Sequence, residues 1–131
     1  MKTLIVEDDF TSRLLLQEIL KSYGPVHIAV NGKEAVEAAR VALEGDDPYD
    51  LICLDIMMPE MSGQEALRQI RGQEEARGTL SSNGAKIMMT TAVADPKNVF
   101  AAFSGLCDAY LTKPIHKAKL LDELRKLKLI K

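Results

Sequence analysis

Five short apolar runs alternate along the chain with segments whose apolar residues recur at helical spacing. The runs lie at residues 4–6, 26–30, 51–54, 87–89 and 109–111. Runs this short and this apolar are typical of strands that are covered on both faces. Because helical segments separate them, we predict an α/β fold of five strands and five helices, doubly wound around a parallel sheet with right-handed crossovers.

Capping and helix-breaking residues set the ends of the predicted helices. The helices cover residues 10–23, 33–44, 63–71 and 96–103, and a last helix includes residues 120–127. Gly24 and Pro25 end the first helix, because glycine often follows helix ends and proline cannot continue a helix. Ser62 with Glu65 forms a capping box for the third helix, and Asp95 supplies the N-cap of the fourth.

Apolar stripes predict which helix faces are buried. The stripe of the first helix contains Leu14, Leu15, Ile19 and Leu20, and that of the last helix contains Leu120, Leu121, Leu124 and Leu127. Beyond this stripe, Leu129 and Ile130 are either exposed contact residues or part of a frayed end. Residues 72–84 are polar and contain three glycines, so we predict a long solvated connection there.

Length and composition indicate one globular domain. The 131 residues fit one domain, because domains run to about 100–200 residues, and no repeat or linker divides them. Apolar residues make up 47% and charged residues 27%, as in a globular rather than a disordered chain. A net charge of −2 and the scarcity of aromatic residues argue against a dedicated nucleic-acid-binding protein.

The N-terminal segment and the cysteines indicate a reducing compartment. Only three apolar residues precede the acidic residues that begin at Glu7, too few for a secretory signal or a membrane span. Cys53 and Cys107 cannot form a disulfide framework, and neither lies at zinc-binding spacing, so both are predicted to be small buried hydrophobic residues. We therefore expect a cytoplasmic location without membrane insertion.

Polar residues with complementary chemistry end four of the five apolar runs. The first run ends in Glu7-Asp8-Asp9, the third in Asp55, the fourth in Thr90-Thr91 and the fifth in Thr112-Lys113. In an open parallel sheet the ligand site lies beyond the carboxyl ends of the strands, so these residues are expected at one edge. Polar residues also end strands without any function, but four ends with matching chemistry favour a site.

The acidic residues at this edge would repel one another. Two carboxylates about 5 Å apart cost roughly 3 kcal/mol at an effective dielectric of about 20. The cluster is tolerated if a carboxyl is protonated, if it spreads into solvent, or if a cation binds, and oxygen ligands alone select Mg²⁺ or Mn²⁺. With Lys113 and Thr91 nearby, the edge would form a phosphoryl pocket in which Asp55, alone at its strand end, is the predicted nucleophile.

Four segments resemble motifs of the response-regulator receiver domain of two-component signalling. They are Leu4-Ile5-Val6-Glu7-Asp8-Asp9, Asp55-Ile56-Met57-Met58-Pro59-Glu60-Met61-Ser62-Gly63, Met89-Thr90-Thr91-Ala92 and Tyr110-Leu111-Thr112-Lys113-Pro114. The resemblance extends from Leu4 to about Leu127 and is to the stand-alone, chemotaxis-regulator-like type. It implies a single domain over residues 1–131 with a flavodoxin-like (βα)5 sandwich and strand order 2-1-3-4-5.

The resemblance also implies a metal site at the acceptor. Asp55 would receive the phosphoryl group and share Mg²⁺ with Asp8, which would bind the ion directly. Glu7 would act through water, and the main-chain carbonyl of Met57 would be the remaining protein ligand. Mn²⁺ would substitute for Mg²⁺.

The remaining matches imply a switch. Thr91 would be the switch hydroxyl, with Thr90 facing elsewhere, and Tyr110 would be the switch aromatic residue. Lys113 would pair with the phosphoryl oxygens, and its peptide bond to Pro114 is expected to be cis. Asp9 is expected to be a solvated residue at the entrance to the first helix.

The implied role is regulatory rather than enzymatic, with self-phosphorylation from donors and slow self-dephosphorylation only. The donor would be a histidine kinase or histidine phosphotransfer protein, and phosphorylation would change the surface between about residues 96 and 127. Because the chain ends soon after the last helix, we expect it to regulate a protein target in trans. Apolar residues two positions after Asp55 and Thr91, which are Met57 and Val93, predict slow hydrolysis of the phosphoryl group.

Three other functions were compared with this one. A metal-dependent phosphatase often needs an acid where this chain has Met57, and a flavin or nucleotide carrier needs a glycine-rich loop after the first strand, which is missing. A receiver-like interaction module without phosphotransfer remains the alternative. Neither His27 nor His116 lies in a context typical of a phosphohistidine.

Overall fold

Five strands form one parallel sheet in the computed structural model of the chain, which describes residues 1–58, 60–79, 83–92 and 106–131. The strands are β1 (Thr3–Val6), β2 (Val26–Ala29), β3 (Leu51–Asp55), β4 (Lys86–Thr91) and β5 (Ala109–Thr112). Their order across the sheet is β2-β1-β3-β4-β5. The predicted flavodoxin-like sheet is therefore confirmed, and the direction in which strands are added reverses between β1 and β3.

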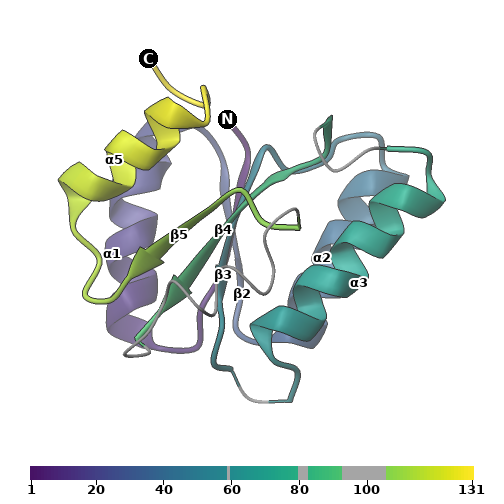
Figure 1. Cartoon of the computed structure of the whole chain (residues 1–131), viewed down its shortest axis with the longest axis horizontal. Coiled ribbons are helices and arrows are strands. Elements are labelled where there is room, and N and C mark those ends of the chain that lie inside the picture. The colour runs from purple at the N-terminus through teal and green to yellow at the C-terminus, as the bar shows by residue number, and fades with distance from the viewer. Residues whose placement is uncertain (59, 80–82, 93–105) are drawn as a thin grey trace.

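Helices cover both faces of this sheet (Figure 1). They are α1 (Phe10–Leu20), α2 (Gly32–Glu44), α3 (Gly63–Ala76) and α5 (Lys117–Lys126), and a short 3₁₀ turn, η1 (Lys21–Tyr23), follows α1. The pair α1 and α5 covers one face, and the pair α2 and α3 covers the other. The helix predicted over residues 96–103 lies outside the described residues. None of the described helices has the length and apolar character needed to cross a membrane.

Alternate residues of the central strands supply two hydrophobic cores. In β1, Leu4 and Val6 pack with α2 and α3, whereas Ile5 packs with α1 and α5. Because both faces are covered, the strand is apolar throughout rather than at every second position. Leu129 and Ile130, predicted to be either exposed contact residues or part of a frayed end, are instead partly buried against the core between α1, α5 and the sheet.

The buried face of α1 differs from the predicted one. Leu16, Ile19 and Leu20 are buried, whereas Leu14 and Leu15 are 44% and 40% exposed. Side chains on one helix face lie three or four positions apart, and residues 14–16 are all leucines that fit more than one such stripe. The prediction that Leu14 and Leu15 are buried is therefore wrong, because Leu16 occupies the face that meets the sheet.

Helix α3 is longer than predicted. The prediction ends this helix at residue 71 and places residues 72–84 in a solvated connection, but the helix continues to Ala76. Arg71 and Glu74 are only 6% and 3% exposed, so a polar pair anchors this part of the helix to the protein. Polarity alone favours a solvated connection, and the buried ion pair is what makes that prediction wrong for residues 72–76.

Both cysteines are buried, as predicted. Cys53 lies in β3 and Cys107 lies just before β5, and they are 1% and 6% exposed. Burial raises the pKa of the Cys53 thiol to about 12 and that of the Cys107 thiol to about 11. Both groups therefore stay protonated near neutral pH and behave as small hydrophobic side chains.

Arg71 is the centre of a buried polar network. Its guanidinium donates to the carboxylates of Glu74 at 2.7 Å and Asp108 at 3.0 Å. It also donates to the main-chain carbonyls of Leu106 at 2.6 Å and Ala85 at 2.8 Å. The network joins the end of α3 to the segments that lead into β4 and β5.

Replacing Arg71 with methionine (Arg71→Met) is expected to lower the free energy of unfolding by about 3–5 kcal/mol, because two carboxylates lose their buried cation. Arg40→Met is the matched control, since the Arg40 side chain is 43% exposed and forms its ion pairs with Glu37 and Glu44 at the surface. The expected loss there is less than about 1 kcal/mol. Urea unfolding measures both losses, and equal values would contradict a stabilising role for the network.

Candidate functional site

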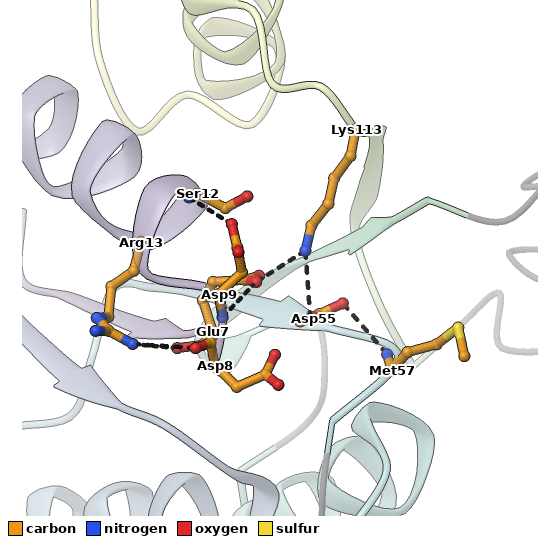
Figure 2. A network of polar contacts seen from close by, with 8 residues as sticks. All are labelled: Glu7, Asp8, Asp9, Ser12, Arg13, Asp55, Met57 and Lys113. Carbon is orange, nitrogen blue, oxygen red and sulfur yellow. Dashed lines mark hydrogen bonds and ion pairs between the residues drawn. The ribbon is translucent and has the colours of Figure 1, made fainter.

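Charged side chains from three strands meet at the carboxyl edge of the sheet (Figure 2). Glu7 and Asp8 follow β1, Asp55 ends β3, and Lys113 follows β5. One carboxylate oxygen from each of the three acids lies within 4.8 Å of the others. Parallel strands place their carboxyl ends at one edge, so the topology brings together residues that are far apart in the sequence.

Lys113 lies between the two buried acids. Its ammonium nitrogen is 2.8 Å from Oε1 of Glu7 and 3.3 Å from Oδ2 of Asp55. The side chains of Glu7 and Asp55 are 1% and 6% exposed, while the Asp8 residue is exposed. The peptide bond between Lys113 and Pro114 is cis, as predicted. The ammonium of Lys113 thus forms ion pairs with two buried carboxylates, and the carboxylate of Asp8 lies beside them.

Burial is the main influence on the protonation of this cluster. It raises the pKa of Glu7, and repulsion from Asp55 adds to the rise, while Lys113 opposes it. Burial likewise raises the pKa of Asp55, with Asp8 adding to the effect and Lys113 opposing it. Burial disfavours the charged ammonium of Lys113, but its contacts with Glu7 and Asp55 outweigh this and raise its pKa. Three carboxyl groups share one ammonium here, and the burial of Glu7 and Asp55 makes their charged forms less favourable than in water.

One buried oxygen of the cluster lacks a partner. Oε2 of Glu7 accepts no hydrogen bond from any residue that the structure describes. A buried carboxylate oxygen without a donor is unfavourable unless a cation or a water molecule binds it. The three acids offer oxygen ligands, the kind that Mg²⁺ and Mn²⁺ prefer. The residues present therefore fit a hard divalent cation.

Met57 lies in the loop after β3, two positions beyond Asp55. Its amide donates to Oδ1 of Asp55 at 3.2 Å, and its side chain is 68% exposed. A surface hollow of about 440 Å³ lies here and is lined by Asp8, Ile56, Met57, Met58, Ser62 and Gln64. The hollow therefore reaches the cluster at Asp8, and the role of Met57 as a carbonyl ligand stays a prediction.

Gly63 lets α3 begin directly beside the end of β3. A Cβ atom at this position would lie 2.1 Å from the main-chain oxygen of Asp55. The amide of Gly63 donates to the carbonyl of Ile56 at 2.9 Å. Ser62 caps the helix by accepting from the amide of Glu65 at 3.3 Å, as its sequence position predicts. The cap is visible in the sequence, whereas the close approach at Gly63 emerges only from the structure.

Asp9 and Arg13 fix the turn between β1 and α1. The Asp9 carboxylate accepts from the amide of Ser12 at 2.9 Å, so it caps α1, and these contacts lower the pKa of Asp9. The Asp9 amide donates to Oε1 of Glu7 at 3.1 Å, and Nη1 of Arg13 donates to the main-chain oxygen of Glu7 at 3.1 Å. Sequence reasoning missed Arg13, because helical periodicity gives no sign that its side chain turns back toward the strand.

The predicted switch residues lie on β4 and β5, the two strands beyond β3. Thr91 ends β4 and is 1% exposed, and its carbonyl accepts from the amide of Lys113 at 2.7 Å. Thr90 lies opposite Asp55 in the ladder between β3 and β4. Tyr110 is half-buried against the core beneath α2 and α3. The roles of Thr91 and Tyr110 in switching stay predictions.

The chain belongs to the response regulator receiver domain family, whose family model matches residues 3–125. The class of protein indicated by the four motifs, a receiver domain of two-component systems, is therefore confirmed. The two-component response regulator ORR41 of Oryza sativa subsp. japonica is 34% identical over 134 residues, which cover 98% of this chain and 95% of ORR41. Other curated relatives are longer, and the chain spans 16% and 48% of the length of two of them.

Solved receiver structures share the whole fold. The receiver domain of sensor histidine kinase PA1611 from Pseudomonas aeruginosa PAO1, with a magnesium ion in its active site cleft, is 28% identical with a TM-score of 0.75, over 95% of this chain and 94% of that one. The receiver domain of histidine kinase CKI1 from Arabidopsis thaliana, complexed with Mg²⁺ and BeF₃⁻, is 27% identical with a TM-score of 0.78, over 97% and 89%. Mg²⁺-bound relatives and the acidic cluster together suggest that this chain binds Mg²⁺.

Asp55→Asn is expected to raise the free energy of unfolding by about 1 kcal/mol at neutral pH without metal. Because the folded-state pKa of Asp55 is raised mainly by burial, the ionised carboxylate weakens the fold above that pKa. The advantage of asparagine should therefore shrink as the pH falls through the folded-state pKa and the wild-type carboxyl takes up its proton.

Urea unfolding from neutral to acidic pH, with a chelator present, measures this difference. Glu75→Gln on the exposed side of α3 is the control and should stay within about 0.5 kcal/mol of the wild type. If Asp55→Asn is less stable than the wild type at neutral pH, the claim that the ionised carboxylate of Asp55 destabilises the fold is contradicted.

Proposed function

We propose that this chain is a signalling switch that accepts a phosphoryl group on Asp55, from a histidine kinase or a histidine phosphotransfer protein, in a Mg²⁺-dependent reaction. The observation that carries this proposal is the cluster at the carboxyl edge. It combines three carboxylate oxygens within 4.8 Å of one another with an ammonium nitrogen 3.3 Å from the acceptor. A phosphoryl group brings negative charge, so its transfer requires cations around the acceptor.

Glu7, Asp8 and Asp55, with the main-chain carbonyl of Met57, would hold the divalent cation, and Mn²⁺ would substitute for Mg²⁺. The unpartnered Oε2 of Glu7 supports this assignment, because a buried oxygen there needs a positively charged or hydrogen-bonding partner. When bound, the cation supplies positive charge that reduces the repulsion between the acceptor carboxylate and the incoming phosphoryl oxygens.

The transfer would form one bond and break one. A carboxylate oxygen of Asp55 attacks the phosphorus of the donor phosphohistidine, the P–N bond breaks, and its electron pair stays with the imidazole. The amide of Met57 holds the acceptor through Oδ1. Lys113, which donates to Oδ2, would exchange that contact for a phosphoryl oxygen.

Phosphorylation would then shift the fold between two packings. The new group adds a charge of about −2 beside the cation. Thr91 would turn its hydroxyl toward a phosphoryl oxygen, and Tyr110 would move further inward from its half-buried position. The surface around β5, α5 and residues 96–103 would change as a result, and a downstream protein would bind one packing better than the other.

The partners follow from the same proposal. Two of the compared receivers belong to histidine kinases, which supports a phosphohistidine donor for this chain. We further propose that residues 1–131 act as one phosphoacceptor unit with a regulatory role, located in the cytoplasm and without direct contact with nucleic acid.

Wild-type protein incubated with acetyl phosphate and Mg²⁺ is expected to gain one phosphoryl group, and Asp55→Asn none. Removal of Mg²⁺ with a chelator should slow labelling by at least about tenfold, because charge repulsion at the acceptor is no longer reduced. Intact-protein mass spectrometry follows the added mass. Asp50→Asn is the matched control at the opposite end of β3 and should be labelled like the wild type.

Two outcomes would contradict this proposal. Full labelling of Asp55→Asn would show that another residue is the acceptor. No labelling of the wild type by acetyl phosphate or by a phosphohistidine protein would favour a receiver-like interaction module that does not take phosphate.

Polar residues two positions after Asp55 and Thr91 should shorten the lifetime of the phosphoryl group. Met57 and Val93 are both apolar, so Met57→Asn combined with Val93→Asn would give an attacking water a hydrogen-bond partner. We expect hydrolysis to become about tenfold faster, the effect of about one hydrogen bond. Val41→Asn, at an exposed position of α2, is the control, and release of inorganic phosphate measures the rates. An unchanged lifetime in the double variant would remove this explanation for slow hydrolysis.

A further inference from the structure

The carboxylate of Asp8 is positioned by the main chain rather than by side-chain contacts. Within the described part of the chain, its carboxylate takes part in no hydrogen bond or ion pair, although it lies within reach of Glu7 and Asp55. Its main-chain oxygen, in contrast, lies 3.5 Å from Nη1 of Arg13. The direction of the carboxylate therefore depends on how the turn over residues 7–9 is held.

Arg13 holds this turn from the side opposite the cluster. Its Nη1 donates to the main-chain oxygen of Glu7 at 3.1 Å and also approaches that of Asp8. Figure 2 shows the guanidinium on one side of the turn and the Asp8 carboxylate on the other. The guanidinium carbon also lies 5.5 Å from the centre of the Phe10 ring, which is a cation–π contact.

We infer that Arg13 is a positioning residue for the divalent cation: by fixing the carbonyls of Glu7 and Asp8, it keeps their carboxylates directed toward the ion. This inference rests on the proposed function, since it concerns the same cation site. A charge-assisted hydrogen bond to a main-chain carbonyl is stronger than a neutral one, so it suits a turn that must resist the pull of a bound ion.

If Arg13 acted through its charge alone, replacing it would raise the Mg²⁺ affinity rather than lower it. The guanidinium is positive, so its field repels a cation, and its removal would strengthen Mg²⁺ binding if charge were all that mattered. A role limited to the stability of α1 would lower the melting temperature and leave the affinity of the folded protein unchanged. The sign of the change in Mg²⁺ affinity therefore separates positioning from both other roles.

Isothermal titration of the full chain with Mg²⁺ alone tests the inference. Arg13→Met keeps the aliphatic part of the side chain and removes the donors, and its Mg²⁺ affinity is expected to fall by about tenfold. Arg13→Lys keeps the charge with a single ammonium, and its expected loss is smaller, about threefold. Lys21→Met removes the same charge from the exposed far end of this helical segment and should stay within about twofold of the wild type.

The outcomes are distinct. Arg13→Met and Arg13→Lys that bind Mg²⁺ as tightly as the wild type, or more tightly, would overturn the inference, whatever their melting temperatures. If Arg13→Met does not fold, Arg13→Lys decides by the same criterion. A wild-type protein that binds no Mg²⁺ would instead overturn the metal site of the proposed function, whereas wild-type binding with unaffected variants would leave that function intact.

Discussion

Repulsion between like charges at one edge of the sheet is the constraint on which the site depends. Glu7 and Asp55 are buried at the ends of the neighbouring strands β1 and β3, and Lys113 contacts both. One ammonium cannot neutralise these two acids and Asp8 as well, and Oε2 of Glu7 has no hydrogen-bond partner among the residues that the structure describes. The unpaired negative charge therefore lowers the stability of the fold at the place where a bound cation would raise it most. This is expected when stability and function compete.

At the opposite edge of the sheet, where the strands begin, buried charges are paired with one another. There, Arg71 contacts two carboxylates, and two main-chain carbonyls accept its remaining hydrogen bonds. Glu74, one of these acids, also accepts from the amide of Ala85 at 2.8 Å. Among the residues that the structure describes, no buried side-chain oxygen or nitrogen of this network lacks a hydrogen-bond partner. A change of charge at the carboxyl edge therefore acts where β4 and β5 end, beside carboxylates that are not fully paired. The beginnings of both strands remain bound to α3 through Arg71.

The sheet and the clustering of the acids could be predicted from the sequence. The strands are local apolar patterns, and the acids directly follow strands whose ends parallel topology brings to one edge. The sequence was insufficient where a choice depended on partners distant along the chain. Leu14 and Leu16 fit competing helix stripes equally well. The length of α3 depends on the buried network of Arg71 and Glu74, which extends to Leu106, 35 positions away from Arg71. The turn held by Arg13 was missed for a similar reason, since its contacts depend on the direction of a flexible side chain.

The two buried cysteines have a practical consequence. Cys53 and Cys107 are shielded from solvent, and burial keeps their thiols protonated. Maleimide dyes react with accessible thiolates, so neither native residue should compete for such a dye while the protein is folded. A cysteine introduced at Ala118, which is exposed on α5, would accept a single fluorophore without removal of the native pair. The chain is therefore well suited to optical recording of changes around its last helix.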